Sequence, residues 1–389
     1  MIVACSATTL AVGMYTKLIE VNYTSVKSIS LDGVNLKPNY DNEKPFLYNG
    51  RVFVPLRFIS ENMDKDVKWL DGNIDIKTKD TTLYEVYKDD YALCTSVYVK
   101  PRPDLGFNYG YYIIIPDNMD IEKTKHMLFE GCNFGFASEK VAPVLLSEHI
   151  YTYGGFQLSK ELKIPYVVPV VPRVTRGTEA FVYTHDLGSA TINISETSKM
   201  HRIDRQVVCM IQYSQRVLSE QFGIHVNSKV LMYGYSASAH FGDRISMLYP
   251  DIVSASCFGG YNSIPILPIK AIGDTVFDYP LGVNNYNKLT GTDFDLNKYT
   301  NISRMYFMGE LDNNDNINAL DCFNYYESSV IANKLGKDMI KERFAKTSEI
   351  ISEVSPNTIF NMYSYAGHSG LSGQAFTDVL KFFRDFINK

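Results

Sequence analysis

A tight turn between an apolar segment and a helical one limits the folds that this chain can adopt. Residues 229–233 have the character of a strand, and a helical pattern resumes through residues 244–248. The intervening Gly234-Tyr235-Ser236-Ala237-Ser238 has small residues two positions on either side of Ser236, which a sharp bend requires. The bend would lift the Ser236 hydroxyl to a helix N-terminus, where free N–H groups favour negative charge. The alternative is an ordinary turn in which Ser236 only caps the helix.

Beyond residue 80 the chain alternates between apolar strands and amphipathic helices. This alternation predicts an α/β domain over residues 81–389, with a mostly parallel central sheet and helices on both faces. Residues 261–300 are rich in Pro, Gly, Asn and Tyr, and they are a candidate lid or substrate-binding insertion. We expect strands at 111–115, 126–129, 166–171, 305–308 and 359–363, and helices at 203–222 and 376–387.

Residues 28–80 have a different pattern, of short strands joined by Asp32-Gly33, Asn49-Gly50 and Asp71-Gly72. Such pairs are typical of β-hairpin turns, and Pro55 opens one short helix. The motifs Asn-Gly-Arg (49–51), Val-Pro-Leu-Arg (54–57) and Val-Lys-Trp (67–69) resemble the copper amine oxidase N-terminal-like stalk module of Firmicute surface proteins. The resemblance implies a spacer, or an attachment unit to the cell wall or surface, and not a copper enzyme. Residues 28–78 contain no His or Cys.

The first 27 residues are expected to be a signal-like or tether segment. Ile2 to Tyr15 is uncharged and mostly apolar, about the length of a signal-peptide core, although no basic residues precede it. A frayed terminal strand is the alternative. Together with the module, the segment predicts a secreted or cell-surface protein of a Firmicute-like bacterium. No other stretch approaches the roughly 20 apolar residues of a membrane span, so no transmembrane span is expected in the mature chain.

The net charge and the cysteine pattern make nucleic acid and metal ions unexpected as partners of this chain. A net charge of −5 gives no electrostatic reason to expect nucleic acid. The six Cys residues include no C-x-x-C pair and no cluster with His, so we expect no metal site.

An acid and a base are both available downstream of Ser236. Of the seven His residues only His368 follows the candidate acids, on a Gly-flanked loop after the last strand. Asp312 lies three residues past Gly309, which ends the strand at 305–308. The order Ser, acid, His therefore predicts Ser236 as nucleophile, His368 as general base and Asp312 as the group that orients it. Asp315 is the alternative acid, since both aspartates lie in one turn-rich loop.

An oxyanion formed at Ser236 would need two backbone donors. The amide of Ala237, next after the serine, is the first candidate. The amide of Cys132, in the loop after the strand at 126–129, is the second candidate, with Asn133 as its alternative.

These motifs together resemble the α/β-hydrolase superfamily over residues 95–389, and more narrowly its polyhydroxybutyrate depolymerase-like and feruloyl esterase-like branches. This chain departs from the pattern at Ser238, where Gly is usual, and at Glu130, where His is usual. The interval of 56 residues between acid and base (368 − 312) is also long. The resemblance implies a serine esterase that hydrolyses small-molecule or polymeric carboxylic esters through an acyl-enzyme, without a cofactor. An acyltransferase or peptidase with the same triad, or a catalytically silent surface-displayed binding protein, is the alternative.

Overall fold

The computed structural model describes residues 19–31, 34–38, 43–63, 65–70, 73–78, 83–90, 92–317 and 322–389. The chain divides into two compact units, Met1–Leu83 and Tyr84–Lys389, which we describe separately. Most of the predicted signal-like segment, including Ile2 to Tyr15, lies outside the described residues, as do the Asp-Gly turns at 32–33 and 71–72.

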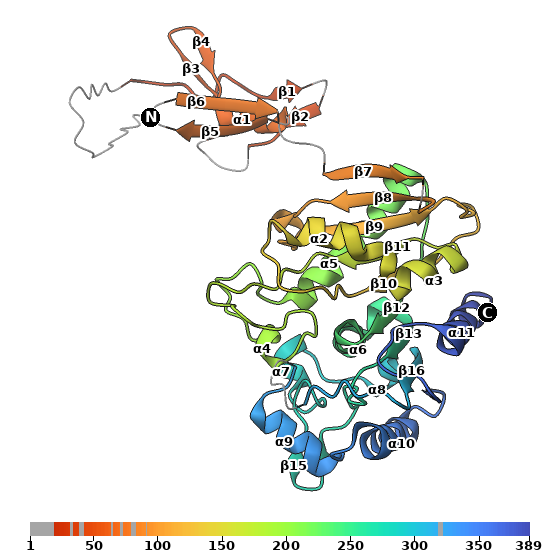
Figure 1. Ribbon diagram of the computed structural model, residues 1–389. Helices are drawn as coiled ribbons and strands as arrows, with labels where there is room; N and C mark the ends of the chain where they lie inside the picture. Colours follow the sequence, from red (N-terminus) through yellow and green to blue (C-terminus); the bar gives the residue numbers. More distant parts are fainter. Residues whose placement is uncertain are drawn as a thin grey trace. The chain divides into compact units, whose positions relative to one another are not determined.

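The described residues of the first unit form three two-stranded hairpins and one short helix, as the module pattern predicted (Figure 1). At the Asn49-Gly50 turn both residues have positive φ, 48° and 72°, the conformation that favours this pair in hairpins. Phe46 and Phe53 stack across that hairpin with ring centroids 5.4 Å apart. The elements are β1 (Ile29–Leu31), β2 (Val34–Leu36), β3 (Phe46–Tyr48), β4 (Arg51–Phe53), α1 (Leu56–Asn62), β5 (Lys65–Leu70) and β6 (Asn73–Thr78).

The second unit is built on a nine-stranded sheet in the order β17-β16-β13-β12-β10-β11-β9-β8-β7. The six strands from β17 to β11 are mutually parallel, and β9, β8 and β7 add an antiparallel edge. This is the α/β-hydrolase fold that the sequence predicted. The strands are β7 (Tyr84–Asp89), β8 (Cys94–Val99), β9 (Tyr111–Pro116), β10 (Leu128–Glu130), β11 (Tyr166–Pro169), β12 (Val230–Tyr235), β13 (Val253–Gly259), β16 (Ser303–Gly309) and β17 (Ile359–Tyr363).

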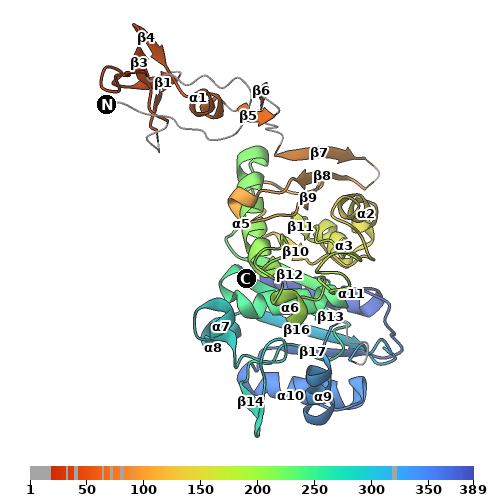
Figure 2. The same cartoon turned by 90° about the vertical axis from the view of Figure 1, so that its left-hand side faces the viewer.

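Helices cover both faces of this sheet. Figure 2 shows α5 on one side and α2, α3 and α11 on the other, and α3 packs against α11. Because both faces are covered, β9, β10 and β11 are buried along their whole length, which explains their continuous apolar runs. The α-helices are α2 (Ala142–His149), α3 (Gly154–Leu162), α4 (Ser189–Ile192), α5 (Ile203–Phe222), α6 (Ala237–Leu248), α7 (Tyr286–Thr290), α8 (Leu296–Thr300), α9 (Tyr325–Lys334), α10 (Phe344–Val354) and α11 (Gly373–Ile387).

Short helical turns and one irregular helix complete the unit. The stretch from Glu327 to Ile351 runs through α9, a π-helical segment and α10. These elements are η2 (Pro103–Leu105), η3 (Ile150–Thr152), η4 (Pro250–Ile252) and the π-helical η5 (Met339–Arg343). Among the described residues, no helix combines the length and the apolar character needed to cross a membrane.

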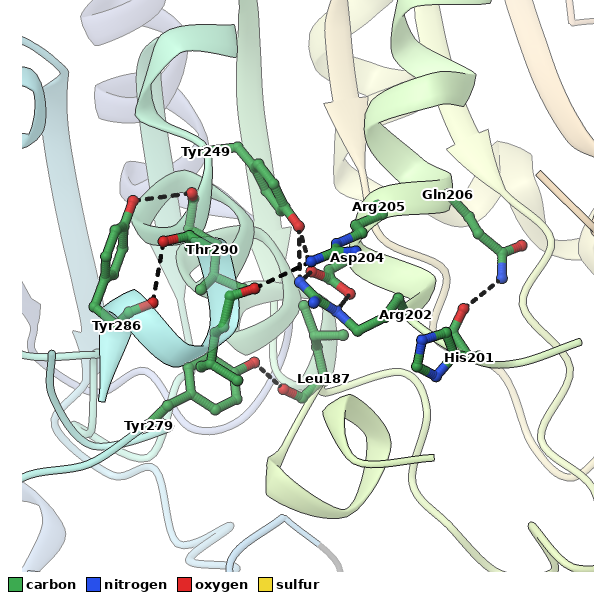
Figure 3. A network of polar contacts seen from close by, with 12 residues as sticks. Leu187, His201, Arg202, Asp204, Arg205, Gln206, Tyr249, Tyr279, Tyr286 and Thr290 are labelled. Carbon is green, nitrogen blue, oxygen red and sulfur yellow. Dashed lines mark hydrogen bonds and ion pairs between the residues drawn. The ribbon is translucent and has the colours of Figure 1, made fainter. Parts of the chain in front are cut away.

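The insertion at 261–300 is attached to the core at several points. It contains the small hairpin β14 (Ala271–Ile272) and β15 (Thr275–Val276) and the helices α7 and α8. The Tyr279 hydroxyl donates to the Leu187 carbonyl, and the Tyr286 hydroxyl donates to that of Leu248 at 3.0 Å. Figure 3 shows these tyrosines beside the start of α5, where Arg205 donates to the Leu289 carbonyl at 3.4 Å. If the predicted lid moves, it must break these contacts.

Candidate active site

The turn at Ser236 has the geometry that a nucleophile requires. Ser236 has φ 61° and ψ −128°, a conformation that L-residues rarely adopt, between the end of β12 and the start of α6. Its amide donates to the Gly259 carbonyl at 2.9 Å, which helps to hold the conformation. A Cβ on Gly234 would lie 2.3 Å from the Ser238 carbonyl oxygen, so only glycine fits there. The sharp bend predicted from the Gly-x-Ser-x-Ser pattern is therefore present.

Ser238 takes the place of the usual glycine without disturbing the turn. Its hydroxyl accepts a hydrogen bond from the Tyr235 amide and donates to the Tyr235 carbonyl, both at 2.9 Å. The Ser238 side chain thus stabilises the turn through two hydrogen bonds to the backbone of Tyr235. Ser238 is 1% exposed, and its Oγ lies 3.5 Å from the Oε1 atom of Glu130.

Glu130, the residue in place of the usual histidine, is a buried carboxyl group beneath the turn. Its Oε2 atom accepts from the Tyr166 hydroxyl at 2.7 Å and from the Gly155 amide at 2.9 Å. Burial nevertheless raises the pKa of Glu130 to about 8, against the lowering effect of these hydrogen bonds. The group is therefore mainly protonated at neutral pH, and its proton belongs on Oε1, which faces Ser238.

The candidate acid and the candidate base meet on the loops that follow β16 and β17. His368 Nδ1 lies 2.9 Å from Asp312 Oδ2, and the Asp312 side chain is 1% exposed against 22% for His368. The Asn314 amide donates to the other carboxylate oxygen, Oδ1, at 2.9 Å. Asp315, the alternative acid, instead pairs with the buried guanidinium of Arg343. In the structure, Asp312, and not Asp315, therefore lies within hydrogen-bond distance of the His368 imidazole.

The imidazole of His368 lies beside the turn that carries Ser236. Its ring centroid is 5.0 Å from that of Tyr235, and a Cβ on Gly260 would lie 3.1 Å from its Cε1 atom. The side-chain nitrogen of Asn314 lies 3.1 Å from Nε2. If that amide donates, Nε2 is an acceptor and Nδ1 carries the proton that Asp312 accepts. This is the tautomer that a general base needs.

The two predicted oxyanion donors, the amides of Ala237 and Cys132, differ from the alternative, Asn133, in whether they already donate a hydrogen bond. In the described part of the chain, neither the Ala237 amide nor the Cys132 amide donates to another residue. The Asn133 amide, in contrast, donates to the Tyr153 hydroxyl at 2.9 Å, and the Asn133 Oδ1 atom accepts from Tyr183 at 3.4 Å. Burial raises the pKa of the Cys132 thiol to about 12, so this residue can contribute its amide but not a reactive thiolate.

Among the described residues, one group of potential metal-ligating side chains exists, although the sequence predicted no metal site. Asp186, His240 and Cys322 are buried and bring one potential ligand atom each within 4.8 Å of one another. All three groups already have partners, since Arg244 pairs with Asp186 at 2.9 Å, His240 Nε2 lies 2.8 Å from the Tyr261 carbonyl oxygen, and Cys322 hydrogen-bonds to Asp186. The guanidinium charge opposes a second cation, so we explain the group as a buried polar network behind α6.

Asn314, Tyr153 and His185 contribute to the site, and sequence reasoning did not find them. Asn314 contacts the imidazole of His368, while the Tyr153 hydroxyl accepts a hydrogen bond from the Asn133 amide. His185 accepts a hydrogen bond from the Phe134 amide at 3.4 Å. Only Asn314 had a signal in the sequence, its position in the same turn-rich loop as Asp312.

Comparison with known proteins gives one family match and several distant structural similarities. Residues 30–99 match the model of the copper amine oxidase N-terminal domain, as the motifs of the module predicted. The matched segment extends past Leu83 into β7 and β8 of the second unit. No match was found among curated protein sequences.

Several solved structures resemble the chain at low identity. An S-formylglutathione hydrolase from Agrobacterium tumefaciens is 12% identical, with a TM-score of 0.41, over 78% of this chain and 99% of that one. The poly(3-hydroxybutyrate) depolymerase LpqC from Bordetella parapertussis is 11% identical, with a TM-score of 0.47, over 75% and 89%. An acetyl xylan esterase from Paenibacillus sp. R4 is 12% identical, with a TM-score of 0.39, over 78% and 87%. The fold assignment itself depends on the strand order described above.

Proposed function

We propose that this protein is a serine hydrolase that cleaves carboxylic esters with Ser236, His368 and Asp312. One observation supports this most directly. The Asp312–His368 pair, at 2.9 Å, lies beside a serine held at φ 61° on a strand-to-helix turn. A helix-capping serine would need neither this backbone conformation nor an imidazole with a buried carboxylate behind it.

The proposed reaction begins when Ser236 Oγ attacks the ester carbonyl carbon and His368 Nε2 takes the hydroxyl proton. Asp312 stabilises the resulting imidazolium through Nδ1. The Ala237 and Cys132 amides donate to the carbonyl oxygen as it becomes negative. His368 then gives its proton to the leaving alcohol, and water hydrolyses the acyl-enzyme by the same steps in reverse order.

The resting hydrogen bond between Asn314 and Nε2 must open before this cycle starts, because the same lone pair takes the serine proton. One hydrogen bond of this kind contributes about 1 kcal/mol net, so its opening is a small cost compared with the barrier to ester hydrolysis.

Labelling by a fluorophosphonate tests the proposal, because such probes react only with an activated serine. The wild-type protein should be labelled and should hydrolyse 4-nitrophenyl butyrate, and Ser236→Ala should abolish both. The matched control is Ser228→Ala, which removes an exposed serine near the start of β12 and should leave both unchanged. A folded wild-type protein that neither reacts with the probe nor hydrolyses the ester would favour a silent binding protein.

The first unit supports a proposal about location. The match of residues 30–99 to this module, whose motifs resemble those of bacterial surface proteins, supports export, with the module as a spacer or surface attachment. Fractionation of cells that express the full chain tests this. Recovery of the protein from the cytosol alone would contradict it.

A further inference from the structure

A cavity of about 520 Å³ lies between two loops at the same edge of the sheet as Ser236. It is lined by residues 136–138 and 173–176, which follow β10 and β11. The two loops are joined by paired backbone hydrogen bonds, from Ala137 to Arg173 at 2.9 Å and from Arg173 to Ala137 at 3.2 Å. Since β10, β11 and β12 are parallel neighbours, the loops after them gather at their carboxyl ends, where α/β proteins bind their ligands.

Two arginines, Arg173 and Arg176, line this cavity. The guanidinium of Arg173 lies 4.3 Å from the ring centre of Phe136 and 3.8 Å from that of Tyr183. Within the described ranges, no ion pair joins Arg173 or Arg176 to a carboxylate. Arg173 Nε is moreover buried without a hydrogen-bond partner in this part of the chain. The aromatic rings attract the cation but leave its N–H donors available to a ligand.

The wall of this cavity is continuous with the proposed oxyanion loop. Tyr183, which contacts Arg173, donates through its hydroxyl to Asn133, the residue after Cys132, at 3.4 Å. Phe136 is 49% exposed and meets Phe181, which is 64% exposed, edge to face at 5.8 Å. A group bound against Arg173 would therefore have an aromatic surface beside it. It would also lie against the same loop as the proposed oxyanion donor Cys132.

We propose that this cavity binds a carboxylate carried by the substrate, so that the enzyme prefers esters with a free acid group. The proposal rests on the proposed ester hydrolysis. Arginine matches a carboxylate geometrically, because its planar N–H groups can donate to both oxygens. The negative group can belong to the acyl part or to the alcohol part of the ester, and the two are separated by experiment.

Two pairs of esters of matched size provide the test. The acyl pair is mono-4-nitrophenyl adipate and 4-nitrophenyl hexanoate, and the alcohol pair is 4-carboxyphenyl butyrate and its neutral 4-carbamoyl counterpart. In one pair the acidic ester should have a kcat/KM at least about tenfold higher than the neutral one, as a charge-assisted hydrogen bond provides. The pair that shows the preference identifies the part of the substrate that enters the cavity.

Variants assign this preference to the arginines. Arg173→Gln and Arg176→Gln should each lower the ratio of acidic to neutral kcat/KM, by about tenfold for Arg173. Arg173→Lys keeps the charge and should retain part of the ratio, which separates recognition from damage to the packing of Phe136. Lys229→Gln, at the opposite end of β12, is the control and should change neither the ratio nor the rates.

A binding measurement distinguishes this proposal from the proposed function. Ser236→Ala should bind benzoate by calorimetry, and the further change Arg173→Gln should weaken that binding about tenfold. If the wild type hydrolyses neutral esters but shows no acidic preference in either pair, the carboxylate site is refuted and the hydrolase remains. If no ester is hydrolysed but benzoate binding depends on Arg173, the hydrolase is refuted and the anion site remains.

Discussion

Replacing Glu130 by Gln should change how the stability of the protein depends on pH. Gln has the same shape, and its oxygen can accept from Tyr166 and Gly155 as Glu130 Oε2 does, while its amide nitrogen faces Ser238. The only large difference is that Gln cannot ionise. The variant therefore isolates the cost of the buried acid beneath the nucleophile turn.

The magnitude follows from the pKa of the carboxyl group. Burial raises this pKa from 4.5 to about 8, so between these values the folded state holds a proton that the unfolded state has released. The wild type therefore loses stability as pH rises through this window, by about 1.4 kcal/mol per pH unit. Over roughly 3.5 pH units the upper limit is about 5 kcal/mol. Below pH 4.5 the two proteins should unfold alike, and above pH 8 the variant should be more stable by the full amount.

Urea unfolding between pH 4 and pH 9 measures this difference. Far-UV circular dichroism is the right signal, because nearly all helices belong to the second unit, whereas the single Trp, Trp69, lies in the first. Glu220→Gln, which removes an exposed carboxyl group, is the matched control and should parallel the wild type. Curves for wild type and Glu130→Gln that remain parallel across the range would refute the argument that this carboxyl group is protonated in the fold.

Three further predictions concern the site itself. Asp312→Asn should lower kcat by about 10³–10⁴-fold because it removes the carboxylate that fixes the His368 tautomer. Asp315→Asn should keep most of the activity but lower the unfolding free energy by about 3 kcal/mol. Steady-state assays and urea unfolding compare the two variants, and equal losses of kcat would contradict the assignment of Asp312. Asn314→Ala should speed fluorophosphonate labelling about fivefold by freeing Nε2, and slower labelling would show that Asn314 positions the base. Cys132→Ala should leave kcat/KM nearly unchanged because the backbone supplies the proposed donor, and a large loss would assign a role to the thiol.

Strong periodicity allowed the sequence to predict several elements well. Helix α5 has the predicted bounds, and β17 coincides with the predicted strand, because each has a regular pattern of apolar residues. Strand β13 was missed because four of the seven residues of Val-Ser-Ala-Ser-Cys-Phe-Gly are Ser, Ala or Gly, although six of the seven are buried. The residues of β13 are buried by elements that are distant in the sequence, so the local pattern of apolar residues does not reveal this strand.

The candidate site was predictable in its residue types but not in its pairings. Asp312 and Asp315 are three residues apart in one loop, and only the path of that loop after β16 decides which carboxylate meets the imidazole. The contact of Asn314 with Nε2 depends on the same path. Glu130 was recognised as a departure from the family pattern, but its network with Tyr166 joins strands that are neighbours only in the folded sheet.

The backbone conformation of Ser236 is unfavourable, and contacts elsewhere in the fold must stabilise it. A non-glycine residue at φ 61° and ψ −128° raises the free energy of the folded state by about 1–3 kcal/mol. Glycine would relax this turn, but it would also remove the hydroxyl on which the proposed chemistry depends. If Ser236 is the nucleophile as proposed, reactivity and stability therefore compete at this one position, and a relative without catalytic activity would gain stability by replacing its serine with glycine.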